Sequence, residues 1–195
     1  MTPASDSKLR PASAALPFAY PLDEFYALAN RELPPIEQVP GEEMPEPYRR
    51  LLVHQDDMTP TLEKFHADRV HLKVISRQTR GDFYFREVVL FTEKTKAPVE
   101  FGAIKINLAL FPPPARRYIL EENEPLGTIL AQYHIGHMSR PKAYLRIQPD
   151  AFISECLQLK ASKVILYGRR NTLFDPQQRS LAEIVEILPP AREKK

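Results

Sequence analysis

An arginine and a glutamate stand side by side within an apolar segment of this chain. In GDFYFREVVLF, residues 81–91, Arg86 and Glu87 are flanked by aromatic and β-branched side chains. Such side chains favour a half-buried strand, and the Gly-Asp pair that opens the segment is typical of a turn. Because successive side chains of a strand point to opposite faces, at least one of the two charges faces an apolar layer. An unpaired charge there is costly, so it requires a partner, either a protein carboxylate or a bound anion.

Further charged residues interrupt apolar segments later in the chain, and they are Arg146, Arg169, Arg170, Glu183 and Glu186. A guanidinium can bind the carboxylate of a small organic acid through two hydrogen bonds. A buried glutamate whose pKa is raised can move a proton. The alternative for each residue is an intramolecular salt bridge or a side chain that reaches the surface. The pattern alone leaves both interpretations open.

Sequence motifs for several other chemistries are absent. The chain has 6 glycines and contains neither a P-loop nor a G-x-G-x-x-G dinucleotide motif. It also lacks a cysteine pair and an H-E-x-x-H motif. His134 and His137, three positions apart in YHIGHMSR, are a weak signal for metal binding, because histidines in loops are commonly solvated or bonded to backbone. We therefore assign no metal ligand and no cofactor.

Composition limits the classes of partner. The chain has 195 residues, enough for one domain with a core, and a net charge of +2 gives no general argument for nucleic acid. The lone Cys156 suits a reducing compartment. No apolar run reaches the roughly 18 residues of a membrane-spanning helix, and the first residues lack a signal-peptide core. We expect a cytoplasmic monomer that binds neither nucleic acid nor membrane.

Proline is concentrated near the N-terminus, where 9 of the 20 prolines lie within residues 1–48. Such a segment cannot form an uninterrupted helix or a central strand. We predict a proline-rich, partly disordered arm over 1–48, whose part from residue 21 onward is irregular or forms a short helix near 23–33. A domain over 49–190 and a short basic tail over 191–195 follow.

The domain alternates between predicted strands and helices. Apolar alternation predicts strands at 70–76, 83–91, 99–111, 141–149, 162–174 and 179–189. Capping residues and helical spacing predict helices at 58–69, 112–123, 125–135 and 150–159. Neighbouring strands at both ends of the domain are joined as hairpins. The pattern predicts an α+β fold with a six-stranded, largely antiparallel sheet and helices on one face.

Five short segments resemble the chorismate pyruvate-lyase family, in matching order along the chain. They are DDMTPTLEKF, YFREVVLF, EPLGTILAQ, LYGRRNTLF and EIVEILP, and together they span nearly all of residues 50–190. The resemblance implies the chorismate-lyase-like fold, which ligand-sensing domains of certain bacterial transcription regulators share. It also implies a cofactor-independent lyase that converts chorismate to 4-hydroxybenzoate and pyruvate in a site closed off from solvent.

The same resemblance implies roles for particular residues. Arg86 would hold a carboxylate or the enolpyruvyl group of the substrate, and Glu186 would transfer the proton. Met58, Leu126 and Gly127 would contact the substrate and close the site. The partner would be a small aromatic or cyclohexadienyl carboxylate.

The closing motif departs from the family pattern. Counted back from Pro189, Val185 occupies the position of the family's catalytic glutamate. A one-residue bulge would restore Glu186, and bulges do occur beside active sites. Without a bulge, Glu183 shares the face of Val185 and is the alternative acid.

A second departure concerns Ala103, which stands where the closest motif of the family carries an arginine; Lys105 on the same face could supply the charge. Both departures bear on the reaction more than on the fold. The alternative function is a non-catalytic domain that binds a small aromatic acid. A sensor domain of a regulator is a third possibility, which residues 1–49 disfavour because they are too proline-rich for a helix-turn-helix.

Overall fold

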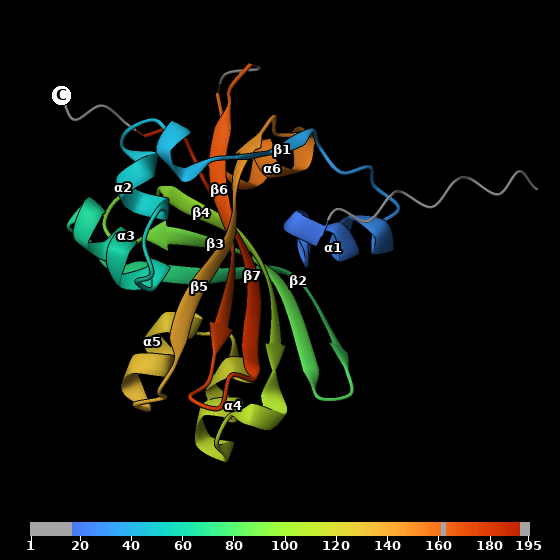
Figure 1. Cartoon of the computed structure of the whole chain (residues 1–195), viewed down its shortest axis with the longest axis vertical. Helices are drawn as coiled ribbons and strands as arrows, with labels where there is room; N and C mark the ends of the chain where they lie inside the picture. The colour runs from blue at the N-terminus through green and yellow to red at the C-terminus, as the bar shows by residue number, and fades with distance from the viewer. Residues whose placement is uncertain (1–16, 161–162, 192–195) are drawn as a thin grey trace, which may run out of the picture.

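The computed structural model describes residues 17–160 and 163–191, and these form one antiparallel sheet with six helices around it (Figure 1). The strand order is β1-β5-β6-β7-β4-β3-β2. The strands are β1 (Ile36–Val39), β2 (Val70–Arg80), β3 (Phe83–Thr92), β4 (Pro98–Asn107), β5 (Met138–Ile147), β6 (Leu166–Phe174) and β7 (Ser180–Leu188). The helices are α1 (Leu22–Leu28), α2 (Tyr48–Leu52), α3 (Met58–His66), α4 (Pro113–Glu121), α5 (Leu126–Gln132) and α6 (Ala151–Cys156).

The predicted α+β class is confirmed, and each of the six predicted strands is present. The sheet nevertheless has a seventh strand, because β1 pairs antiparallel with β5 and places Ile36 opposite Ile147. This strand lies in the segment for which we expected an irregular arm or a short helix. Four residues between Pro35 and Pro40 are too few for alternation to be recognised. The expectations for residues 1–16 and 192–195 lie outside the described residues.

Helices cover both faces of the sheet, which corrects the expectation of helices on one face. On one face, α1 and α6 bring Phe25 and Ile153 into a core with Phe85 of β3. On the other face, α4 and α5 bring Ile119 and Ile129 into a second core. Two helical layers are required because β3 is apolar on both sides. Leu22, Phe25 and Tyr26 recur at helical spacing and form the buried side of α1.

Helices α6 and α3 begin in different ways. The Asp150 carboxylate accepts a hydrogen bond from the backbone N–H of Ile153 and caps α6. Helix α3 begins at Met58, and Asp57 before it forms no capping hydrogen bond with its side chain. This start places Asp57, Met58 and Thr59 together beside the sheet.

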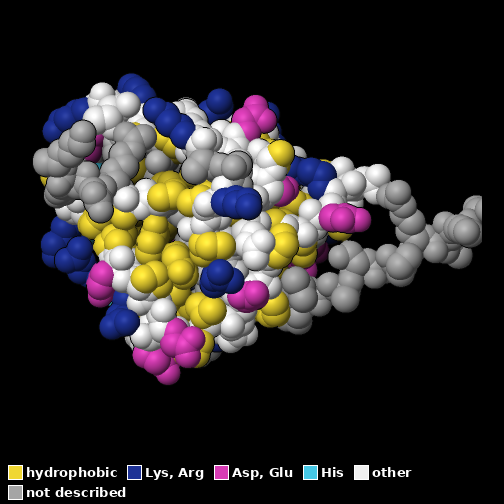
Figure 2. Space-filling model, turned by 90° about the horizontal axis from the view of Figure 1, so that it is seen from above, with side chains coloured by type: hydrophobic (Ala, Val, Ile, Leu, Met, Phe, Trp, Pro, Cys, Tyr) yellow, Lys and Arg dark blue, Asp and Glu magenta, His cyan; other side chains and the backbone are white. Residues whose placement is uncertain are grey.

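The surface mixes apolar and charged side chains. Seen from above, hydrophobic side chains gather in the middle of the face, and charged side chains of both signs lie around them (Figure 2). Within residues 17–160 and 163–191, none of the helices has the length and hydropathy needed to cross a membrane.

Candidate functional site

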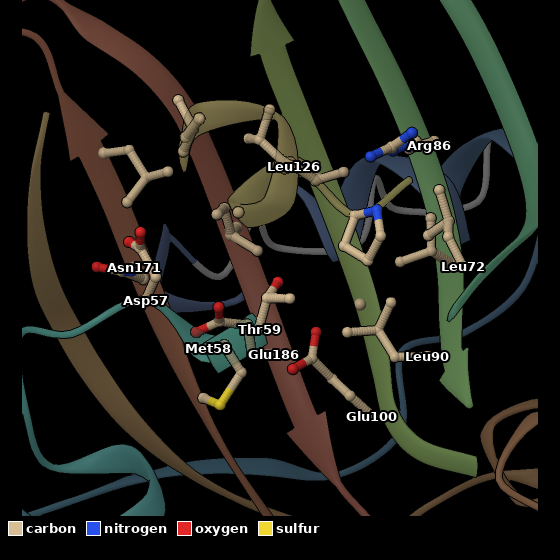
Figure 3. Close-up of a pocket in the computed structure, with 18 residues that line it drawn as sticks. Asp57, Met58, Thr59, Leu72, Arg86, Leu90, Glu100, Leu126, Asn171 and Glu186 are labelled. Atoms are coloured by element: carbon tan, nitrogen blue, oxygen red, sulfur yellow. The ribbon is translucent and has the colours of Figure 1, made fainter. Parts of the chain in front are cut away.

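A hollow of about 70 Å³ lies between one face of the sheet and the starts of α3 and α5 (Figure 3). Strands β2, β3, β4, β6 and β7 supply one wall, and Met58 and Leu126 come from the two helices. Ligand sites commonly have volumes of roughly 300–1,000 Å³, so this hollow suits a small compact molecule. We call it the cavity below.

All five candidate site residues line this cavity: Met58, Arg86, Leu126, Gly127 and Glu186. Gly127 is needed for the approach of α5 to α3, because a Cβ atom there would lie 2.8 Å from Oγ1 of Thr59. The five residues come from four separate elements, so the fold brings together what the motifs place far apart in sequence. Their roles remain predictions.

Arg86 is buried without a charged partner. Its side chain is 1% exposed, and its one hydrogen bond runs from Nη1 to the carbonyl of Ile119 at 3.5 Å. In the part of the chain that the structure describes, Arg86 forms no ion pair and its Nε has no acceptor. Burial lowers the pKa of Arg86, and the nearby Tyr84 and Glu122 oppose this effect. Of the two partners that we considered for Arg86, the protein carboxylate is therefore absent from the described residues.

The carboxylate of Glu122 is already engaged. It accepts hydrogen bonds from the Tyr84 hydroxyl and from Nη1 of Arg77. Burial and the bond to Glu122 raise the pKa of Tyr84. Glu122 therefore acts on Arg86 only at longer range.

Glu87 points to the opposite face and is held by protein groups. Its Oε2 accepts a hydrogen bond from the Ser76 hydroxyl at 2.5 Å and lies 3.9 Å from Nη2 of Arg31. Burial raises the pKa of Glu87, and both neighbours oppose the rise. For Glu87 the interpretation as a structural contact is therefore supported.

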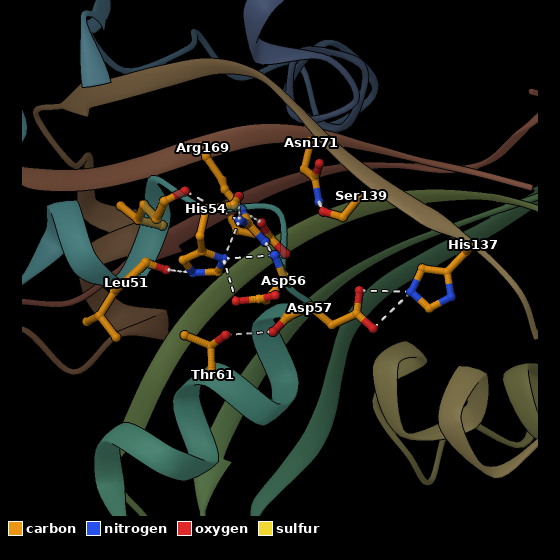
Figure 4. A network of polar contacts seen from close by, with 11 residues as sticks. Leu51, His54, Asp56, Asp57, Thr61, His137, Ser139, Arg169 and Asn171 are labelled. Carbon is orange, nitrogen blue, oxygen red and sulfur yellow. Dashed lines mark hydrogen bonds and ion pairs between the residues drawn. The ribbon is translucent and has the colours of Figure 1, made fainter. Parts of the chain in front are cut away.

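Glu186 is also paired, although it lines the cavity. Its Oε2 accepts a hydrogen bond from Nε of Arg169 at 2.5 Å, and both side chains are buried. The other nitrogens of Arg169 donate to the carbonyls of His54 at 3.1 Å and Asp56 at 3.2 Å (Figure 4). Arg169 thus fixes the segment before α3 to the sheet and neutralises Glu186.

The structure resolves which glutamate of β7 faces the cavity. The register of β7 with β4 is continuous from Ala182 to Ile187, so the bulge that would shift Glu186 is absent. Glu186 faces the cavity without it, because Val185 points into the opposite core. Glu183 also points away and pairs with Arg170 at 2.6 Å. The alternative that Glu183 serves as the acid of this site is therefore wrong.

Lys105 does not replace the arginine of the family motif. Ala103 is part of the core under α1 and α6, on the face away from the cavity. Lys105 shares that face, and its Nζ lies 4.4 Å from the centre of the Phe83 ring. Neither residue lines the cavity.

Glu100 is a site residue that the motifs did not indicate. Its side chain lines the cavity, is 5% exposed, and its Oε2 has no hydrogen-bond partner among the described residues. Burial raises the pKa of Glu100 well above its ordinary value; Glu186 adds to the rise and Arg169 opposes it. Alternation along VEFGAI could have indicated it, because Glu100 shares a face with Gly102 and Ile104.

An ionic contact lies at one wall of the cavity. Nε2 of His137 lies 2.9 Å from Oδ2 of Asp57, and Nδ1 lies 2.8 Å from the carbonyl of Ile135 (Figure 4). Both ring nitrogens face acceptors, which favours the doubly protonated ring. The hydrogen bond to Asp57 raises the pKa of His137, while burial opposes the rise. Asp57 lines both the cavity and an open groove on its other side.

Comparison with known proteins reveals the fold. No family model and no curated protein matches the chain. PhnF from Mycobacterium smegmatis is 12% identical with a TM-score of 0.53, over 73% of this chain and 67% of that chain. The effector domain of the same protein gives 12% identity and a TM-score of 0.53, over 70% of this chain and 90% of that chain. A gene product from Staphylococcus aureus gives 8% identity and a TM-score of 0.50, over 64% of this chain and 90% of that chain. The chain therefore has the fold of the PhnF effector domain, which is the chorismate-lyase-like α+β fold that the sequence motifs imply.

Proposed function

We propose that this chain is a non-catalytic domain that binds a small organic acid in the cavity, with Arg86 as the anchor for the carboxylate. The observation that carries the proposal is the buried guanidinium of Arg86, which has no counter-ion among the described residues. A carboxylate in the cavity would supply the missing charge and accept from nitrogens that now lack partners. Without such a ligand, burial of this charge is unfavourable.

The rest of the cavity suits an apolar ligand body. Leu72, Val88, Leu90 and Leu130 line it along with the polar groups. A flat ring or a short aliphatic chain can pack against such side chains, while its carboxylate reaches Arg86. This combination supports a small aromatic carboxylate as the ligand. The likeness in fold to the effector domain of PhnF agrees with a binding role.

Chorismate lyase activity is the second candidate. Its support is the meeting of Arg86 and Glu186 with Met58, Leu126 and Gly127 around one cavity, as the family resemblance implies. Two features weigh against it. The proposed acid, Glu186, is neutralised by Arg169. The family motif has an arginine where this chain has Ala103, and among the described residues no lysine or arginine other than Arg86 lines the cavity.

Calorimetric titration with benzoate tests the binding proposal, and benzamide serves as the neutral analogue. We expect the wild-type protein to bind benzoate and to bind benzamide at least tenfold more weakly, since only the carboxylate pairs with Arg86. Arg86→Met should weaken benzoate binding at least tenfold. Arg146→Met, which removes the partner of Glu37 in β5, is the matched control and should leave affinity unchanged. Equal affinity of wild type and Arg86→Met for benzoate would contradict the proposal.

An assay with chorismate separates the two candidates. The purified protein is incubated with chorismate, and 4-hydroxybenzoate and pyruvate are quantified. Absence of turnover together with binding of 4-hydroxybenzoate supports the binding domain. Turnover that is lost in both Arg86→Met and Glu186→Gln would instead establish the lyase.

A further inference from the structure

The sheet register fixes how far apart the backbone positions of Arg86 and Glu100 lie. Arg86 lies opposite Ile104, and Glu100 is four residues before Ile104 on the same strand. At about 3.3 Å per residue this separates their positions by about 13 Å along the sheet. Both side chains face the cavity, and Figure 3 shows them apart, with Glu186 beside Glu100. The cavity therefore has a cationic end and a carboxyl end.

Gly102 lines the cavity between its two ends. It lies opposite Val88, halfway between the two ends. A Cβ atom at Gly102 would lie 3.1 Å from Cγ2 of Val88 and 3.4 Å from Oε1 of Glu100. The carboxyl group of Glu100 therefore reaches back along the strand toward this glycine and toward Arg86. A side chain larger than that of glycine would crowd this carboxyl group and the Val88 methyl group.

The carboxyl group of Glu100 can serve as a hydrogen-bond partner for a ligand. It is enclosed, and one of its oxygens has no partner in the part of the chain that the structure describes. Burial, together with the neighbouring Glu186, raises its pKa and so favours the protonated form. A protonated carboxyl group offers one O–H donor and retains acceptor capacity, so it suits a hydroxyl, carbonyl or ether group.

The same end of the cavity is unsuited to a second carboxylate. The nearest cation, Arg169, is already bonded to Glu186 and to the carbonyls of His54 and Asp56. A ligand carboxylate at this end would be desolvated beside Glu186 without a free cation to compensate it. The two ends therefore differ in the charge that they accept.

We infer that Glu100 determines specificity, selecting a ligand with one carboxylate and one neutral polar group at its far end over a dicarboxylate of equal length. This inference rests on the proposed function, because Arg86 is taken to hold the carboxylate. It names the substrate class more narrowly: a hydroxy or keto monocarboxylate. It also predicts that the site discriminates against a molecule with two carboxylates, such as chorismate.

Three para-substituted benzoates test the inference by calorimetry: 4-hydroxybenzoate, 4-methylbenzoate and terephthalate. We expect the wild-type protein to bind 4-hydroxybenzoate about tenfold more tightly than 4-methylbenzoate, as one buried hydrogen bond allows. Terephthalate should bind at least tenfold more weakly than 4-hydroxybenzoate. Glu100→Leu should reduce the preference for the hydroxyl to twofold or less while 4-methylbenzoate still binds. Glu100→Gln, which keeps a neutral donor and acceptor, should preserve it.

The outcomes distinguish this inference from the proposed function. If wild type binds the hydroxyl and methyl compounds equally, or binds terephthalate as well as 4-hydroxybenzoate, the role of Glu100 is overturned. The Arg86 proposal then stands, provided that benzamide still binds at least tenfold more weakly than benzoate. If wild type binds none of the three benzoates, both proposals fail. If Glu100→Leu does not fold, the wild-type titrations and Glu100→Gln still test the inference. Loss of the preference for 4-hydroxybenzoate over 4-methylbenzoate in Glu100→Gln would contradict the role of Glu100 as an uncharged hydrogen-bond partner.

Discussion

Arg86 and Arg169 lie on the same face of the sheet, and their side chains are 1% and 0% exposed. Arg169 pairs with Glu186 and donates to backbone carbonyls of the segment before α3. Arg86 has one long hydrogen bond and no ion pair in the described part of the chain. Two equally buried guanidiniums thus differ in what compensates their charge. The difference separates a structural contact from a group that is available to a ligand.

The largest expected effect is on stability, at the structural arginine. Arg169→Met should lower the free energy of unfolding by about 3–5 kcal/mol, because Glu186 would remain buried without its partner. Unfolding in urea, followed by circular dichroism, measures the change. Arg170→Met is the control: its pair with Glu183 lies on the other face and is about one-fifth exposed, so we expect a loss below about 1 kcal/mol. Equal losses in the two variants would break the comparison.

Arg86→Met should act in the opposite direction in the absence of ligand. Removing an unsatisfied buried cation while keeping its apolar stem should raise the free energy of unfolding by about 1–3 kcal/mol. The same urea experiment provides the measurement. A loss of stability comparable to that of Arg169→Met would mean that Arg86 has a structural partner after all, and the contrast between the two arginines would disappear.

The half-buried pair of His137 and Asp57 should give the smallest effect, and one that depends on pH. The folded-state pKa of His137 is raised above 6.5, mainly by its hydrogen bond to Asp57. The contribution of this pair to the free energy of unfolding is therefore complete below pH 6.5. It is lost as the pH rises through the raised folded-state pKa of His137. Near pH 5.5 we expect the free energy of unfolding of the wild type to exceed that of His137→Gln by about 1 kcal/mol, and we expect this difference to vanish at high pH. His71→Gln, on the exposed side of β2, is the control. A difference independent of pH would contradict the assignment.

Alternation along the strands predicted much of the cavity. The period of two placed Arg86 and Glu87 on opposite faces and put Glu186 on a different face from Glu183, and the structure agrees on both counts. The resemblance in sequence grouped Met58, Leu126 and Gly127 with them, and all three line the cavity. The faces of the strand residues could be predicted because pleating is a local property that residue spacing reveals directly. The roles of all these residues remain predictions.

The pairing of Arg169 with Glu186 could not be predicted in the same way. The two residues lie directly opposite each other in the hairpin of β6 and β7, so the sequence contains the pair. The register shifts between Leu173 and Phe174, however, and counting from the turn then assigns every later pair incorrectly. Glu100 was overlooked for another reason: the family motif drew attention to Ala103 and Lys105, which face the other core.

Strand β1 has a consequence for how the chain can be shortened. Residues 36–39 pair with the backbone of β5 from Tyr144 to Ile147, which would otherwise be an unpaired edge of the sheet. A chain trimmed to begin at residue 49 would present those amide and carbonyl groups to other molecules, and it would also uncover the core beneath α1. An unpaired edge strand of this kind can pair with strands of other molecules and so promote aggregation. The prolines on either side of β1 keep it short, so it protects β5 without offering a long template of its own.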